Sequence, residues 1–357
     1  MIIDTELNSA AQIPSDVCLR AAVEAERRGF GCVWKGAANS RDPFVLLSGM
    51  ATLTQRIQFG TAIYHVFGSS PVTLAMQAAT FNEMSGGRLL LGIGVGNPVI
   101  AGWHGQEFSR PLRLAREYIE IIRAIYSGEK IPAIEGDFFS TRRGFKLAFE
   151  PPKEPLEIWL AGLGPQMARL AGKISDGIVI NMADGDVLGE IIATFRDGAR
   201  DAGRDPAGLN AVSKIRVSLH EDVTKARWAL KKVLTFYALQ QGYSEVLRRM
   251  GWGEVVDTVA TKHRTEGFGA ARRSIPDEML EAVPMYAGTD LSGLPAKLAV
   301  HEAAGVTRCN VAYVPADDSR QWEEIQHFLG LAEGVIGHDS FPGQRSGSGA
   351  GLQGSVR

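Results

Sequence analysis

Cysteine is scarce in this chain of 357 residues, which contains only Cys18, Cys32 and Cys309. The three lie far apart and form no CxxC pair, so neither a disulfide framework nor a thiol redox motif is indicated. No apolar run reaches the roughly 18 residues that a membrane-spanning helix needs. The N-terminus also lacks the basic and then apolar segments of a signal peptide. We therefore expect a cytoplasmic protein with reduced, buried cysteines and no membrane association.

Neither sign of charge is in large excess, since 38 Lys and Arg residues face 40 Asp and Glu residues, for a net charge of −2. A chain without a basic surplus lacks the electrostatic footprint of a nucleic-acid-binding protein. No set of His, Cys, Asp and Glu has the spacing of metal ligands, and the GxSxG motif of serine hydrolases is missing. The expected partner is a small-molecule substrate, with no nucleic acid and no metal.

The stretch around residues 59–98 organises the rest of the sequence. Its parts are an apolar run (57–63), a helix start at Ser70-Pro71, a stop at Gly86-Gly87, a second apolar run (89–93) and a Gly-rich loop (94–98). Serine before proline is a typical helix start, and glycine adopts the left-handed conformation that ends a helix. Strand, helix and strand predict a parallel crossover unit. Because the strands lack polar alternation, both faces of the sheet should be covered.

The other apolar runs and amphipathic segments alternate in the same way. Strands are predicted over 2–7, 30–34, 57–63, 89–93, 156–161, 177–182, 211–219 and 308–314, and most are followed by a helix. This order predicts a single (β/α)8 TIM barrel over residues 1–336, although a doubly wound open sheet fits the pattern alone. We expect a hairpin insertion at about 131–152 and an insertion of two or three helices within 222–285. The Gly/Ser-rich residues 337–357 are predicted to be disordered.

Two motifs resemble those of a known family. They are Ser85-Gly86-Gly87-Arg88 followed by LGIGVG at 91–96, and AGLGPQM at 161–167. The chain resembles the bacterial-luciferase-like flavin- and deazaflavin-dependent oxidoreductases. Within them it is most similar to the branch of methylenetetrahydromethanopterin reductase. The resemblance implies the barrel rather than the open sheet, a homodimer, and coenzyme F420 or, alternatively, FMN as the cofactor.

In such a barrel the reactive groups lie at the carboxyl ends of the strands. That rule selects Glu6, Trp34, Lys35, Tyr64, His65, Asn97, residues 162–166 and Asn181. In the resembled family, a non-proline cis peptide or a bulge after the third strand supports the flavin ring from behind. The matching bond here is Ala62-Ile63, with an ordinary trans bond as the alternative. Tyr64, Asn97 and Asn181 are expected beside the same cofactor.

The second motif is a candidate phosphate site formed by Gly162, Leu163, Gly164 and Gln166. Glycines let backbone N–H groups approach a phosphate, and the amino end of the following helix adds positive potential. A short Gly-containing loop is also a common plain turn, and the longer match to the family favours the phosphate site. The loop at 94–97 does not continue into a complete GxGxxG, so a Rossmann site is not expected.

Glu6 and His65 are the candidate catalytic residues. Glu6 matches an acidic residue of the reductase branch, and a desolvated carboxylate in a barrel mouth can donate a proton. A structural, salt-bridged glutamate is the alternative. His65 could hydrogen-bond a flavin carbonyl or donate a proton, or it could be a polar residue of the rim. The residues expected to line the substrate pocket are Trp34, Lys35, Trp103 and His104.

The sequence departs from the resembled branch at two positions. The loop at 35–40 has Ala37 and Ala38 where the branch has an acidic residue, often followed by His. Asn97 stands where the methylenetetrahydromethanopterin reductases have Asp. A proton relay from the first loop and a methanogenic pterin substrate are therefore not expected.

Three functions remain open on the sequence. The first is hydride transfer between coenzyme F420 and a small organic substrate, with the cofactor carrying the hydride. The second is an FMN-dependent monooxygenase that uses reduced flavin and oxygen. The third, suggested by Ala37 and Ala38, is a ligand-binding barrel that has lost its catalytic group.

Overall fold

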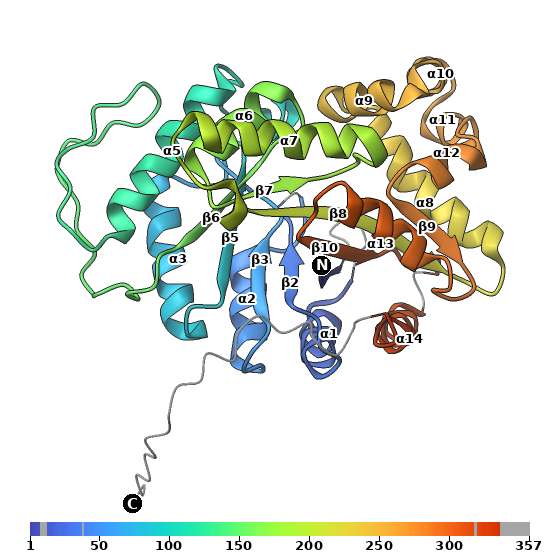
Figure 1. Cartoon of the computed structure of the whole chain (residues 1–357), viewed down its shortest axis with the longest axis horizontal. Helices are drawn as coiled ribbons and strands as arrows, with labels where there is room; N and C mark the ends of the chain where they lie inside the picture. The colour runs from blue at the N-terminus through green and yellow to red at the C-terminus, as the bar shows by residue number, and fades with distance from the viewer. Residues whose placement is uncertain (8–12, 38, 318–319, 336–357) are drawn as a thin grey trace, which may run out of the picture.

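Eight parallel strands close into a barrel in the computed structural model, which describes residues 1–7, 13–37, 39–317 and 320–335 (Figure 1). The barrel strands are β1 (Ile2–Leu7), β2 (Cys32–Lys35), β3 (Gln58–Thr61), β5 (Leu89–Gly94), β6 (Glu157–Ala161), β7 (Gly177–Ile180), β8 (Asn210–Leu219) and β10 (Arg308–Tyr313). Strand β10 pairs with β1 on one side and with β8 on the other. This closure excludes the open sheet and confirms the TIM barrel. The predicted tail at 337–357 lies outside the described residues.

The helices that cover the barrel begin where the capping residues predict. Asp42 and Ser70 accept hydrogen bonds from Val45 N–H and Thr73 N–H, and Gly86 ends its helix with φ of 71°. These outer helices are α1 (Ser15–Arg27), α2 (Pro43–Thr52), α3 (Pro71–Ser85), α5 (Pro111–Tyr126), α6 (Pro165–Ile174), α7 (Gly185–Asp201), α13 (Leu294–Ala303) and α14 (Gln321–Ala332). The segment predicted as a loop at 95–111 contains a short helix, α4 (Pro98–Trp103), which Asn97 caps.

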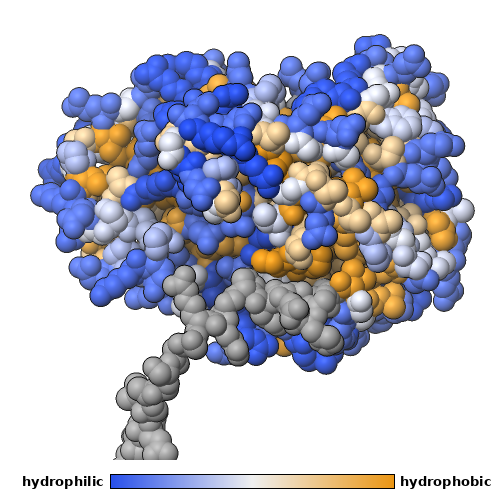
Figure 2. Space-filling model, in the orientation of Figure 1, coloured by the Kyte–Doolittle hydropathy of each residue, from blue (hydrophilic) through white to orange (hydrophobic). Residues whose placement is uncertain are grey.

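Residues 222–285, all of them described, form a layer of helices at one edge of the barrel mouth (Figure 1). They comprise α8 (Val223–Ala238), α9 (Gln241–Leu247), the π-helical turn η2 (Arg248–Trp252), α10 (Gly253–Glu266), α11 (Phe268–Arg273) and α12 (Asp277–Ala282). This is more helix than the two or three segments expected. The sequence analysis also missed β9 (Met285–Gly288), which pairs with the end of β8. In the same view, hydrophilic side chains cover most of the upper surface, and apolar ones gather around α13 (Figure 2).

The other insertion is only partly a hairpin. Residues 131–152 contain two isolated antiparallel bridges, Ile131 with Phe145 and Glu135 with Ser140, and no longer strand. The Glu117 carboxylate of α5 holds the turn of this segment, because it accepts hydrogen bonds from the backbone N–H groups of residues 137–139.

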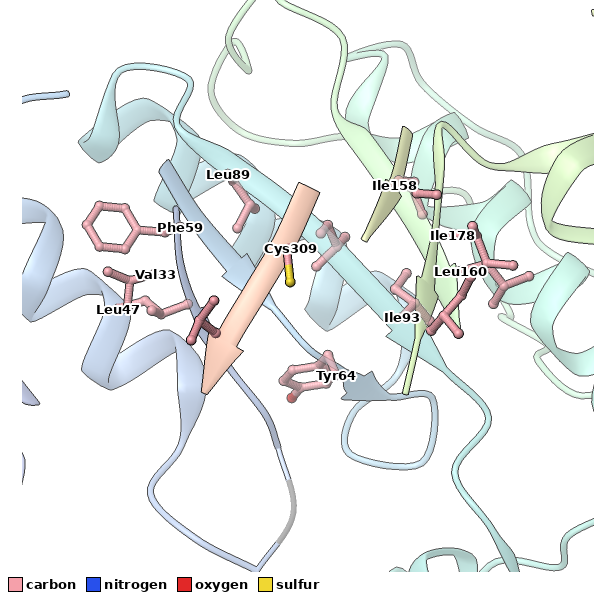
Figure 3. Packing of buried hydrophobic residues seen from close by; sticks show 14 of the residues in the cluster. Val33, Leu47, Phe59, Tyr64, Leu89, Ile93, Ile158, Leu160, Ile178 and Cys309 are labelled. Atoms are coloured by element: carbon pink, nitrogen blue, oxygen red, sulfur yellow. The ribbon is translucent and has the colours of Figure 1, made fainter. Parts of the chain in front are cut away.

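The strands place alternate side chains in two separate cores. Outward-facing residues such as Val33, Phe59 and Ile178 pack against the helices, for example against Leu47 of α2 (Figure 3). Cys18, Cys32 and Cys309 are buried free thiols, as expected, and burial raises the pKa of Cys18 to about 11. No helix among the described residues is long and apolar enough to cross a membrane.

The amino-terminal half of the barrel interior is filled. Arg308 donates to both carboxylate oxygens of Asp4, at 2.8 Å each, and Trp34 Nε1 donates to the same carboxylate at 2.8 Å. The rings of Trp34 and Trp159 lie 5.6 Å apart and pack with Leu90, among other small apolar residues. This plug closes the barrel from below and leaves its upper half to the site.

Removal of Arg308 should reveal the importance of the charge pair under the plug. Arg308→Met leaves the fully buried Asp4 carboxylate without its cation, so we expect the free energy of unfolding to fall by about 3–5 kcal/mol. The measurement is urea unfolding followed by circular dichroism. Arg20→Met, which breaks an exposed pair with Asp16, is the control and should cost about 0.5 kcal/mol. Equal losses of unfolding free energy in the two variants would contradict the stabilising role assigned to the Asp4–Arg308 pair.

Candidate functional site

One side of the barrel mouth is an apolar wall with almost no side-chain bulk. The peptide bond Ala62-Ile63 is cis, which confirms the sequence prediction. Its flanks are tied to the loop after β2, since Ala62 N–H donates to Lys35 O and Ala37 N–H donates to Ile63 O. A Cβ atom on Gly94 would lie 2.0 Å from Ile63 Cδ1, so only glycine lets Ile63 occupy this place. The wall therefore offers a smooth surface against which a flat ring could lie.

The opposite side of the mouth is charged. Glu6 of β1 accepts hydrogen bonds from Lys214 Nζ at 2.5 Å and from Asn310 Nδ2 at 2.7 Å. The residues Glu6 and Asn310 are nearly inaccessible, with exposures of 2% and 1%, and Lys214 is 9% exposed. Glu6 is thus the ion-paired glutamate that the sequence analysis held as an alternative to a proton donor. These two partners hold the carboxylate in place on the inner side of the barrel.

A second cation, Arg216, extends this charged side upward. Its guanidinium donates to Asn181 Oδ1 at 2.9 Å and to Tyr237 Oη at 2.8 Å, and it lies 4.6 Å from the centre of the Tyr237 ring. Tyr237 belongs to α8, and its ring meets that of Tyr243 edge-on at 4.6 Å. The predicted residue Asn181 is therefore joined to a network supplied partly by the helical insertion.

The sequence analysis missed most of this network. The missed residues are Lys214, Arg216, Tyr237, Tyr243 and Asn310. A signal was present for three of them, because Lys214 and Arg216 occupy alternate positions of β8 and Asn310 alternates with Arg308 in β10. Alternate residues of a strand share one face, so polar groups at these positions point into the barrel together. No local signal marks Tyr237 or Tyr243.

His65 lies in the two-residue strand β4 (Tyr64–His65), directly after the cis peptide. Burial, with a smaller contribution from His104, lowers the pKa of His65 from its usual 6.5 to about 4. Its Nδ1 atom is buried and has no hydrogen-bond partner among the described residues. A neutral imidazole with a free nitrogen can hydrogen-bond a ligand, but it is not a charged proton donor at neutral pH.

The four residues expected in the substrate pocket lie at different places. Trp34 is 1% exposed and lies inside the plug, so it does not line the substrate pocket as predicted. Lys35 is also buried, donates to Ser40 Oγ at 3.0 Å, and has a pKa lowered by burial. Trp103 is 57% exposed at the end of α4, and His104 follows it on the surface.

Asn97 connects two parts of the rim. Its Oδ1 accepts from Ile100 N–H at 3.0 Å and so caps α4, and its Nδ2 donates to Gln240 Oε1 at 3.2 Å. Asn97 thereby joins the loop after β5 to the start of α9. In this position an amide serves better than a carboxylate, since it can donate to Gln240 as well as accept at the cap.

The candidate phosphate loop after β6 has one closed and one open glycine. Gly162 is buried and its N–H donates to Val179 O at 3.3 Å, and an added Cβ would lie 3.2 Å from Ala168 N. Gly164 is exposed, with nothing within 4 Å of an added Cβ, and it precedes the first turn of α6. Arg249 of η2 lies beside this loop, 3.4 Å from Leu163 O. The open part of the candidate site is therefore Leu163, Gly164 and the helix start at Gln166.

A cleft of about 770 Å³ opens next to this loop, between α7, α12, β9 and α13. Its charged lining consists of three cations, Arg227, Arg249 and Lys297, and three acids, Asp184, Asp186 and Glu281. Several of these groups pair with one another or with neighbours. The cleft therefore has no net charge, and the chemically distinctive groups lie in the barrel mouth instead.

A closed α/β barrel with buried charged groups toward the carboxyl ends of its strands is the architecture of a barrel enzyme. Comparison with known proteins identifies the family of this barrel. The family described as luciferase-like monooxygenase matches residues 4–308, and the chain belongs to it. It is an oxidoreductase of this family.

Named relatives and solved structures agree with this membership. A Mycobacterium tuberculosis protein named as a coenzyme F420-dependent oxidoreductase, Rv3520c, is 31% identical over 83% of this chain and 90% of its own. A 5,10-methylenetetrahydromethanopterin reductase of Archaeoglobus fulgidus is 32% identical over 72% of this chain and 78% of its own. The coenzyme F420-dependent tetrahydromethanopterin reductase of Methanopyrus kandleri has the same fold, with a TM-score of 0.80, 23% identity and coverage of 94% and 99%.

The lowered pKa of His65 predicts a specific dependence of stability on pH. Between pH 6.5 and about 4 the unfolded chain binds a proton at His65 and the native protein does not. Stability is thus fully present above pH 6.5 and falls as the pH drops through this window. His65→Gln should lose less stability than the wild type between pH 6.5 and 4, as measured by urea unfolding. The exposed His327→Gln should keep the wild-type slope, and parallel slopes for all three proteins would refute the prediction.

Proposed function

We propose that this protein transfers a hydride between coenzyme F420 and a small organic substrate. The observation that carries the proposal is the division of the mouth into an apolar wall and the buried Glu6–Lys214 pair. A ring resting on the wall at Ala62-Ile63 would turn its other face toward the charged side. Bound deazaflavin supplies a carbon that carries the hydride, and the protein positions it and excludes water.

The residues of the mouth fit such a cofactor. Ala62, Gly94 and Ala161 leave the wall flat, and Ile63 provides an apolar support. His65 Nδ1, buried and unpartnered among the described residues, is suited to hydrogen-bond a ring substituent. Asn97 lies at the rim beyond the wall. Tyr64, which was predicted beside the cofactor, instead packs in the outer core with its ring 5.7 Å from that of Phe44 on α2, so no cofactor contact is proposed for it. Backbone N–H groups around Gly164 and Gln166 would hold the phosphate at the start of α6.

The relatives favour coenzyme F420 over FMN. The proteins at 31% and 32% identity are named for coenzyme F420 or for a tetrahydromethanopterin reductase. An EDTA monooxygenase shares the fold at 17% identity with a TM-score of 0.72, and a type II Baeyer-Villiger monooxygenase in complex with FMN shares it at 19% identity with a TM-score of 0.68. An FMN-dependent monooxygenase is therefore the second candidate. The neutral cleft beside the phosphate loop offers no surplus positive charge to an anionic cofactor tail. The choice between coenzyme F420 and FMN therefore depends on a measurement of their binding.

The substrate side is proposed to lie over Glu6. The carboxylate holds the Lys214 ammonium inside the mouth, where it can orient a polar substrate atom opposite the ring. Trp103 and His104 at the end of α4, with Lys35 below, are proposed to border this space. A methanogenic pterin is not proposed, because the residue at 97 is Asn.

We further propose a cytoplasmic homodimer. Helices α2 and α3 expose Val45, Met76 and Met84 at 76%, 38% and 54%. A groove of about 320 Å³ runs between these helices over Phe44 and Phe81. An apolar face of this kind is suited to contact a second copy of the chain.

Cofactor binding decides between the two candidates. We expect purified protein to bind coenzyme F420 at least tenfold more tightly than FMN in side-by-side fluorescence titrations. Tighter binding of FMN would favour the monooxygenase. Binding of neither would favour a barrel that has lost its catalytic function.

A substitution at Gly164 tests the phosphate loop. Gly164→Asp places a carboxylate where the phosphate would lie, so cofactor affinity should fall at least tenfold while the fold is kept. The control is Gly208→Asp, at an equally open and exposed glycine on the far side of the barrel. Unchanged affinity in Gly164→Asp would rule out this loop. Gly162→Val is the poorer test, because the tight contact with Ala168 N couples it to folding.

A further inference from the structure

The mouth needs a group that exchanges a proton with the substrate, and the predicted candidates are poorly suited to the task. Glu6 is held by Lys214 and Asn310. Burial keeps His65 neutral, with a pKa of about 4. The loop after β2 contributes Ala37, which has no proton to give. Another group on the charged side should therefore do this work.

Tyr237 lies where such a group is required. Its oxygen accepts from Arg216 Nη2 at 2.8 Å, and the same guanidinium donates to Asn181 Oδ1 at 2.9 Å. The titratable and charged groups that face Tyr237 come from each element around it: Arg216 and Lys214 on β8, Glu6 on β1 and Tyr243 on α9. Tyr237 is partly exposed as a residue, while its hydroxyl is buried within this network.

Two unsatisfied polar atoms indicate that a polar molecule binds on this side. Asn310 Oδ1 and Ser218 Oγ are buried and have no hydrogen-bond partner among the described residues. Asn310 contacts Glu6, and Ser218 is two residues from Arg216 on the same face of β8. Buried polar atoms are normally paired. A hydroxyl or amine of a ligand would donate to Asn310 Oδ1, whereas a carbonyl or imine would accept from Ser218 Oγ. The two atoms would meet different parts of a ligand, because Ser218 lies four residues, or about 13 Å, beyond Lys214, the residue that pairs with Asn310.

We propose that Tyr237 is the catalytic acid and base of the reaction, a role that rests on the proposed function. In the direction of reduction, the electrophilic carbon of a C=O or C=N bond receives the hydride. The adjacent oxygen or nitrogen takes the proton of the Tyr237 hydroxyl as the π bond breaks. The phenolate that remains is stabilised by Arg216 and regains a proton from solvent. In the direction of oxidation, the phenolate removes the proton from the alcohol or amine.

The electrostatic surroundings distinguish Tyr237 from its neighbour. Burial alone would raise the pKa of Tyr237, but Arg216 and Lys214 outweigh it and leave this pKa below its usual value. For Tyr243, burial and the neighbouring Tyr237 raise the pKa to about 12. Two phenols whose rings lie 4.6 Å apart thus serve as a candidate and its matched control.

The first test needs neither cofactor nor substrate. Titration of the phenolate absorption of the free protein should reveal one tyrosine that ionises below the usual pKa of about 10. The step should vanish in Tyr237→Phe, persist in Tyr243→Phe and move to higher pH in Arg216→Met. If Tyr237→Phe leaves the lowest step in place, the proposal is overturned whether or not coenzyme F420 binds.

The second test measures turnover. Reduced F420 is mixed without oxygen with a ketone, an aldehyde and an imine, and the best acceptor is used. Tyr237→Phe should lower kcat about 10²- to 10⁴-fold, remove one limb of the pH profile, and leave F420 affinity and KM near the wild type. Tyr243→Phe should retain activity within a few-fold. Equal losses in both variants would assign Tyr237 a structural role, whereas failure to bind F420 would overturn the proposed function instead.

Discussion

Charges buried inside a closed barrel must be paired, and this constraint shapes the molecule. An ion in the barrel interior loses its hydration, and only close partners compensate for that loss. Asp4 is satisfied by Arg308, and Glu6 by Lys214. Both pairs join β1 to β10 or β8, the strands at which the first and last parts of the chain meet. The Glu6–Lys214 pair in the mouth is therefore the same kind of contact as the Asp4–Arg308 pair, and both help to hold the barrel closed.

The barrel interior differs along its axis as well as in the charge of its two sides. The tryptophan plug formed by Trp34 and Trp159 fills the lower half, so a ligand can enter only from the carboxyl ends of the strands. Above the plug, β3, β5 and β6 contribute glycine and alanine, whereas β1, β8 and β10 contribute long polar side chains. This asymmetry gives a flat molecule one preferred orientation, because only one side of the mouth can lie against its face.

Much of the barrel could be predicted from the sequence, because the signals involved are local. The run Leu89–Gly94 is apolar on both faces and was recognisable as a buried strand, and the caps at Asp42, Ser70 and Gly86 depend on a few neighbouring residues. The cis bond at Ala62-Ile63 was predicted only through the family resemblance. Strand β9 has four residues, one of them glycine, and without its pairing to β8 it has no strand signature.

The site was harder to predict. The position of a residue in its strand indicates how far along the barrel axis it lies, but not which way its side chain points. Trp34 lies at the expected end of β2, yet its side chain turns inward and down to Asp4. Lys214 and Arg216 look like ordinary polar residues of a strand until the barrel is known to close around them. The partners Tyr237 and Tyr243 come from an insertion whose packing depends on contacts distant in sequence, and no local pattern places them.

The helical insertion is best understood as part of the site. It contacts the mouth at three separate places: Tyr237 binds Arg216, Gln240 binds Asn97, and Arg249 lies against Leu163. These contacts reach the strand that carries the charges, the loop that follows the apolar wall and the candidate phosphate loop. A shift of α8 and α9 would change all three together, because the residues lie within a short stretch of one chain. Substitutions that displace these helices should therefore alter cofactor binding and chemistry together, and related barrels could diverge in substrate by changing this one segment while the strands stay constant.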